Sequence, residues 1–166
     1  MTEETKSQLI VREEDMSIGY LSQALKDAFY EVSNITDNSF DVVIAEYRAT
    51  IKILEDKKCL NIRCVDRVGD YQPELFAHLL EAVNEANSEI INVCSSLRHY
   101  EDEEDNLIFL EVQQYISYRN GMIMQQFMYL LRSFEQIDVC IYRDYVMKAV
   151  REFEEEMEAA KNRVLN

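Results

Sequence analysis

The spacing of the apolar residues changes several times along this chain, and each change predicts a different secondary structure. Between Ile18 and Val32 the apolar residues recur every three or four positions, which is the spacing of one face of an amphipathic helix. Between Phe40 and Val68 the spacing falls to two, as in strands that are buried on one side. A chain that uses both spacings in turn predicts a sheet with helices packed against it.

Three strand-like runs follow the first helix. Residues 40–45 and 49–54 are rich in β-branched side chains, and the apolar residues of 60–65 alternate with polar ones. The charged link at residues 55–58 is short enough to join the second and third runs as a hairpin. Together the three runs predict an antiparallel meander.

The second half of the chain repeats this arrangement with different lengths. Pro73 stands where a first helical position would be, and a second apolar stripe follows it as far as Ala86. Residues 91–100 and 106–116 then predict a second hairpin around an acidic turn. Apolar residues at helical spacing after Gly121 predict a long final helix, with Asn120 interpreted as its cap.

The predicted fold class is therefore α+β, with a five-stranded antiparallel sheet, helices packed on one side, and the order α-β-β-β-α-β-β-α. Residues 1–14 are predicted to be a loose polar leader. Residues 15–150 are predicted to form one domain, and residues 151–166 a charged helical extension.

The charge of the chain argues against two classes of partner. Its 166 residues include 32 acidic and 17 basic ones, which gives a formal net charge of −15. Nucleic acids and anionic membranes are bound by clustered lysine and arginine, so neither is expected as a partner. With no signal peptide and no apolar run near the roughly 18 residues of a membrane helix, a cytoplasmic location is expected.

The element order and its junctions resemble the YbjN family, whose fold is shared with type III secretion chaperones. The resemblance covers roughly residues 17–150. The second helix ends in a helix-to-strand junction that is habitual in the family, with Asn84 and Asn87 before the next strand. The other matching segments are residues 21–29, 41–45, 49–54, 60–65, 91–97 and 107–112.

This resemblance implies a function as well as a fold. For relatives of the secretion-chaperone type it implies a homodimer that binds partially unfolded polypeptides. For YbjN-like proteins it implies a loosely defined regulatory role.

The residues themselves favour no catalytic or metal site. His78 and His99 are the two histidines, too few for the paired Glu-x-x-His motifs of a di-iron bundle. The four cysteines lack zinc-ligand spacing and are expected to be reduced thiols. Cys94 lies five residues from His99 in a strand, which places the two on opposite faces. We expect no enzyme, no metal and no cofactor.

The last predicted strand is apolar on both faces. Ile108 and Leu110 share one face, while Leu107 and Phe109 point to the other. Helices on one side of the sheet cover only one of these faces, so Leu107, Phe109 and Tyr115 are predicted as a protein-contact surface. The alternative is that the long helix or the C-terminal segment covers them.

Two functional hypotheses follow. The first is a non-enzymatic module that binds an unidentified polypeptide partner as a homodimer. The second is a sensory or signal-transduction regulatory domain that binds a small ligand or a signalling protein. Native mass spectrometry separates them, because a co-purifying polypeptide supports the first and a small adduct supports the second.

Overall fold

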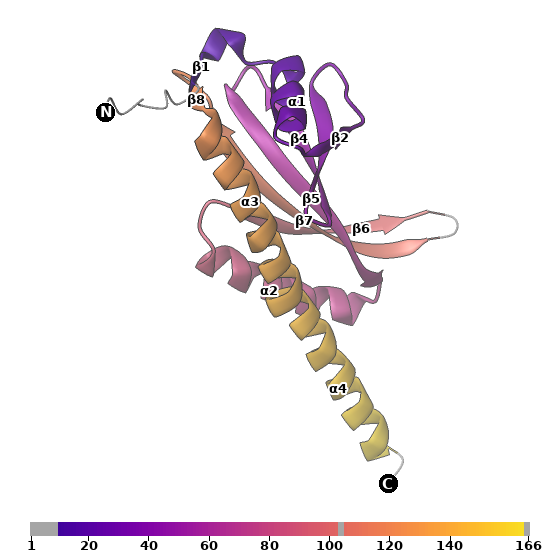
Figure 1. Ribbon diagram of the computed structural model, residues 1–166. Helices are drawn as coiled ribbons and strands as arrows, with labels where there is room; N and C mark the ends of the chain where they lie inside the picture. The colour runs from indigo at the N-terminus through magenta and orange to yellow at the C-terminus, as the bar shows by residue number, and fades with distance from the viewer. Residues whose placement is uncertain (1–9, 103–104, 165–166) are drawn as a thin grey trace. The chain divides into compact units, whose positions relative to one another are not determined.

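The computed structural model describes residues 10–102 and 105–164, and it contains both helices and strands (Figure 1). The helical elements are η1 (Glu13–Asp15), α1 (Ile18–Asp27), α2 (Pro73–Glu89), α3 (Met124–Cys140), η2 (Ile141–Val146) and α4 (Met147–Val164). The strands are β1 (Ile10–Val11), β2 (Glu31–Ser33), β3 (Ser39–Ile44), β4 (Tyr47–Leu54), β5 (Cys59–Asp70), β6 (Cys94–Glu101), β7 (Asn106–Ser117) and β8 (Met122–Ile123).

The main sheet has six strands in the order β2-β3-β4-β5-β7-β6. Strands β2 to β5 pair antiparallel in turn, and β6 pairs antiparallel with β7. A separate two-stranded sheet joins β1 to β8. The α+β class is confirmed, but the predicted count of five strands is wrong by one, because β2 was interpreted as the end of the first helix.

The first helix ends earlier than its apolar spacing predicted, and this creates β2. Phe29 adopts a left-handed conformation with φ +65°, and its side chain is 97% exposed. The Tyr30 N–H donates to the Leu25 carbonyl at 3.0 Å, which closes the last turn in a Schellman-type ending. Val32 then pairs with Val42 in the sheet. Apolar spacing does not reveal such a reversal when the left-handed residue is not glycine.

Of the three predicted helix starts, those at Ile18 and Pro73 are confirmed. The Ser17 hydroxyl accepts a hydrogen bond from the Tyr20 N–H at 3.2 Å, which caps α1. Pro73 is the first residue of α2, where its missing N–H has no helical partner to lose.

By contrast, the predicted cap at Asn120 is wrong. Asn120 and Gly121 both have positive φ, +65° and +98°, and they form the turn that leads into β8. A side chain at Gly121 would place its Cβ 2.8 Å from the carbonyl oxygen of Val11 in β1. Ile10 and Val11 of the predicted leader thus belong to a strand, while residues 1–9 lie outside the described part of the chain.

The chain divides into two compact units, and β5, β7 and α3 continue from one into the other. The first unit contains the described residues up to Arg63 and the segment Tyr115–Glu135. In its core α1 packs against β2 and β3, and Phe40, Ile51 and Ile62 lie side by side on β3, β4 and β5. All three of these side chains are fully buried.

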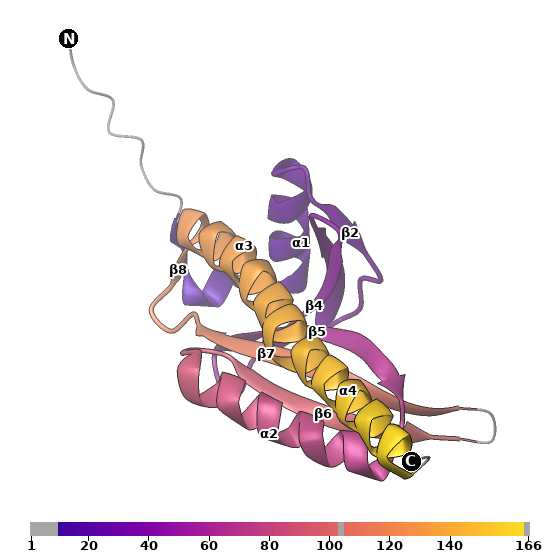
Figure 2. The ribbon, with the colours of Figure 1, turned by 90° about the horizontal axis from the view of Figure 1, so that it is seen from below.

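The second unit contains the described residues of Cys64–Gln114 and Gln136–Asn166. Helix α2 packs against β6, η2 and α4, as Figure 2 shows for β6 and α4. Its buried residues include Leu79 and Val83 of α2 and Ile108, Leu110 and Val112 of β7. Within the described residues, no helix is long and apolar enough to cross a membrane.

Candidate functional site

Strand β6 is the last strand of the main sheet, so only one of its edges is paired. It pairs with β7 along its whole length, from Cys94 opposite Gln113 to Glu101 opposite Asn106. The strand at the other end of the sheet, β2, is only 3 residues long. The eight residues of β6 are therefore the longer of the two sheet edges.

The hydrogen bonds of one side chain show which way the backbone groups of β6 point. Asn87 of α2 donates from Nδ2 to the Ser95 carbonyl at 2.8 Å and accepts from the Ser95 N–H at 2.8 Å. The backbone groups of Ser95 therefore point away from β7. Because these directions alternate along a strand, those of Leu97, His99 and Glu101 point the same way.

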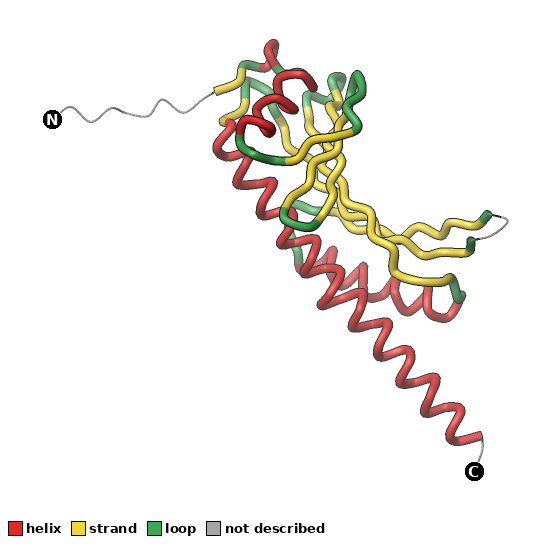
Figure 3. Tube along the Cα trace, turned by 45° about the vertical axis from the view of Figure 1, so that its right-hand side comes forward, coloured by secondary structure: helices red, strands yellow, loops and turns green. Residues whose placement is uncertain are grey.

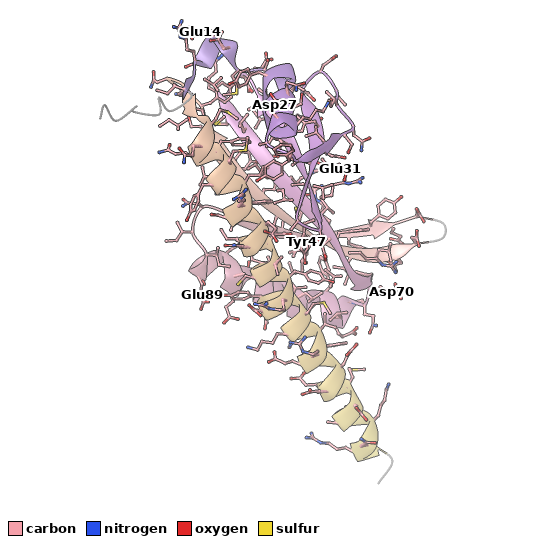
Figure 4. All side chains as sticks on the ribbon, in the orientation of Figure 1. Glu14, Asp27, Glu31, Tyr47, Asp70 and Glu89 are labelled. Atoms are coloured by element: carbon pink, nitrogen blue, oxygen red, sulfur yellow. The ribbon has the colours of Figure 1, made fainter. Side chains whose placement is uncertain are left out.

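The carboxamide of Asn87 thus makes the two hydrogen bonds at Ser95 that a neighbouring strand would make. From Leu97 to Glu101 the same edge continues, and the β6–β7 hairpin extends past the first turn of α2 (Figure 3). We name the outward backbone groups of Leu97, His99 and Glu101 the β6 edge.

An aromatic cluster borders the β6 edge on the face of the sheet that α2 covers. The His99 ring stacks on Tyr71 with centroids 3.7 Å apart, and Phe76 lies 5.5 Å from Tyr71 at a tilt. Asn106 Oδ1 lies 2.6 Å from His99 Nε2 and holds the imidazole in this position. Tyr71 and Phe76 remain half-buried, so parts of their rings face solvent.

The opposite face carries polar and aromatic side chains. Arg98 forms a two-point ion pair with Glu111, with Nε 2.5 Å from Oε2 and Nη2 3.0 Å from Oε1. Glu111 is only 2% exposed, and Gln113 also donates to it. Tyr100 is 51% exposed and donates to Asp102 at 2.8 Å, a bond that raises the pKa of its phenol. A buried carboxylate held from two sides stiffens the middle of the hairpin.

The tip of the hairpin is acidic, as its sequence predicted. The Asp102 N–H donates to the Asp105 carbonyl at 2.9 Å, and the Asp105 N–H donates to Asp102 Oδ1 at 2.7 Å. Two carboxylates, with Glu101 beside them, thus lie at one end of the β6 edge. Negative charge gathered there attracts basic segments.

The three residues that the sequence predicted as a contact surface have different environments. Leu107 is 8% exposed and lies opposite Tyr100, as the alternative of coverage within the chain would have it. Phe109 is half-buried opposite Arg98, and Tyr115 is 56% exposed in the other unit. A contact role for Phe109 and Tyr115 stays a prediction.

Sequence reasoning missed the β6 edge because it concentrated on the apolar strand of the hairpin. The available signal was the polar character of β6, whose eight residues include one aliphatic side chain, Leu97. Polar strands are typical of sheet edges, since they face water along one side.

A second group of titratable side chains lies inside the second unit. The Cys64 thiol hydrogen-bonds to Asp138, and burial, followed by the charges of Asp138 and Asp66, raises its pKa. Asp138 is fully buried, and burial also raises the pKa of Asp66. A thiol with a raised pKa stays protonated at neutral pH and is a poor nucleophile. Among the described residues, no three His, Cys, Asp or Glu side chains are placed to hold a metal ion.

Comparison with known proteins identifies the fold. No family model and no curated protein sequence matches the chain. The crystal structure of YbjN from E. coli, proposed to be a transcription regulator, matches with a TM-score of 0.61 and 17% sequence identity. The match covers 82% of this chain and 93% of the YbjN chain. The chain has the YbjN fold. The resemblance to YbjN that the element order predicted is thereby confirmed.

Proposed function

We propose that the protein is a non-enzymatic, homodimeric binding module that takes up an extended polypeptide segment along the β6 edge. The observation that carries the proposal is the paired hydrogen bonding of Asn87 to Ser95. These two hydrogen bonds indicate which backbone groups of β6 face outward. An added strand would pair with those groups.

Backbone pairing supplies part of the binding free energy. Leu97, His99 and Glu101 each offer one N–H and one C=O, and a hydrogen bond contributes about 1 kcal/mol net. Ordering each residue of a flexible partner costs about 1–2 kcal/mol. The two contributions nearly cancel, so contacts with the side chains beside the edge decide the affinity. Tyr71, Phe76 and His99 provide them on one face, and Tyr100 on the other.

Charge determines the chemistry of the partner. The net charge of −15 and the acidic hairpin tip favour a basic polypeptide and oppose direct contact with DNA. YbjN is proposed to be a transcription regulator. A comparable regulatory role for this chain would therefore act through a protein partner.

The proposal is tested with a basic unfolded polypeptide, reduced lysozyme whose cysteines are blocked with iodoacetamide. Fluorescence anisotropy measures its binding to the full chain. Leu97→Pro removes one outward N–H from the β6 edge, and Leu97→Ala is the matched control that shortens the side chain but keeps the N–H.

We expect Leu97→Pro to bind at least about fivefold more weakly than Leu97→Ala, as the loss of one hydrogen bond implies. Equal affinities for the two variants, or no binding by the unmodified chain, would contradict the proposal. Circular dichroism melts establish that both variants are folded.

A further inference from the structure

Helix α4 carries an apolar stripe with the spacing of a coiled coil. Val150, Phe153, Met157 and Ala160 follow one another at intervals of three, four and three residues. This spacing alternates the two core positions of a heptad repeat, a and d. Val150 and Met157 then occupy a positions, and Phe153 and Ala160 occupy d positions.

Only part of this stripe is covered within the second unit. Helix α2 packs against α4, and beside their contact lies a groove of about 510 Å³. Leu75, Val150, Phe153 and Met157 line the groove, and Met157 is 43% exposed. Helix α4 continues past α2, as Figures 1 and 3 both show. In this part of α4 the stripe consists of Met157 and Ala160, and both residues are exposed.

The charges beside the stripe identify what fits there. The heptad places Glu154 and Lys161 at e positions and Glu156 and Arg163 at g positions. All four side chains are exposed, and each flank combines one acid with one base seven residues apart. A flank that carries both signs at this interval is complementary to an inverted copy of itself.

The pairing can be worked out position by position. When two α4 helices lie antiparallel with Met157 of one beside Ala160 of the other, e positions face e positions and g positions face g positions. Glu154 then faces the partner's Lys161, and Glu156 faces the partner's Arg163. The twofold axis repeats both pairs, so all four contacts join opposite charges.

A parallel arrangement is less complementary, because g positions then face e positions of the next heptad. Glu156 would face the partner's Lys161, while Glu154 would face the uncharged Ala149 of the partner. The antiparallel arrangement thus forms twice as many complementary contacts.

We propose that the homodimer forms through α4, with the α4 of each copy lying antiparallel in the α2–α4 groove of the other. The inference rests on the homodimer of the proposed function and adds its interface. The occupant of the groove is a second copy of this chain, and the interface closes on itself without leaving a surface for further copies.

The test is a charge exchange in the full chain, followed by sedimentation velocity at low salt. Glu154→Lys alone places like charges at two contacts of the dimer, and so does Lys161→Glu alone. Each is expected to weaken dimerisation about tenfold or more. An equimolar mixture of the two variants restores opposite charges at both contacts and should dimerise like the unmodified chain.

Glu155→Lys is the matched control for charge. It makes the same change one residue away, on the side of α4 opposite the stripe, and should leave the dimer unchanged. The double variant Glu154→Lys/Lys161→Glu should also dimerise normally, because it exchanges the two charges without changing their complementarity.

Each other outcome overturns a defined part of the account. Loss of the dimer in Lys161→Glu but not in Glu154→Lys would indicate the parallel arrangement and refute the antiparallel one. A dimer that none of these variants weakens would refute the α4 interface and leave the proposed homodimer intact. A monomer at every concentration would refute both, while polypeptide binding at the β6 edge is decided separately by the Leu97 variants.

Discussion

Proline scanning along β6 tests the direction of its backbone groups. The structure assigns an outward N–H to Leu97 and an N–H that pairs with β7 to Arg98. Proline lacks the N–H, so Leu97→Pro removes no hydrogen bond of the sheet, whereas Arg98→Pro removes one and leaves a carbonyl of β7 without its donor. The two substitutions are neighbours in sequence but should differ widely in their effect on stability.

The magnitudes are compared after subtracting the loss of each side chain. Leu97→Ala measures the loss of the half-buried leucine, and Arg98→Ala measures the loss of the ion pair with Glu111. Relative to Leu97→Ala, Leu97→Pro should lower the free energy of unfolding by about 1 kcal/mol or less, because an edge strand adjusts locally to proline. Proline at Arg98 should cost about 3 kcal/mol, from the lost hydrogen bond, the unsatisfied acceptor and the backbone conflict.

Thermal melts followed by circular dichroism provide the assay. A change of 1 kcal/mol shifts Tm by about 2–4 °C in a chain of this size, so the two proline effects should differ by roughly 4–8 °C. Equal proline effects at the two positions would refute the alternation on which the β6 edge depends. A larger effect at Leu97 would mean that the strand faces β7 with the opposite set of backbone groups.

Two further predictions concern the two units separately. Phe29→Gly should stabilise the protein by about 0.5–1 kcal/mol in urea unfolding, because glycine relieves the left-handed strain while the exposed ring loses no contact; destabilisation would contradict this. Burial raises the pKa of Asp66 above its ordinary 3.8, so the folded state holds its proton more tightly than the unfolded state does. The stabilisation that protonated Asp66 contributes is complete below its ordinary pKa. It disappears as the pH rises through the raised pKa of the folded state. Asp66→Asn should reduce this loss of stability in thermal melts between pH 4 and neutrality. An unchanged dependence of Tm on pH would refute this prediction.

Much of the fold could be predicted because local chemistry and apolar spacing agree. Pro73 and the stripe after it defined α2, and alternation at residues 49–54 and 60–65 defined the central hairpin. Where they disagreed, the prediction failed. Phe29 reverses the chain in a conformation that phenylalanine rarely adopts, so the stripe was extended through β2.

The candidate site was harder to predict for a different reason. Alternation shows which face of a strand a side chain occupies but not which strand lies at the edge of the sheet. The order β5-β7-β6 places the polar strand outside, and only this order gives β6 an unpaired edge. Leu107 is a related case, because its parity was recognised but its burial within the chain was left open as an alternative.

The central claim is that an extended polypeptide pairs with the outward backbone groups of β6. Residue-resolved amide hydrogen exchange by NMR, with and without the unfolded, alkylated lysozyme, measures this pairing directly. We expect the N–H groups of Leu97, His99 and Glu101 to become protected when the polypeptide binds. Those of Arg98 and Tyr100, which already pair with β7, should be slow to exchange in both states. Binding that leaves the N–H groups of Leu97, His99 and Glu101 unprotected would contradict the account.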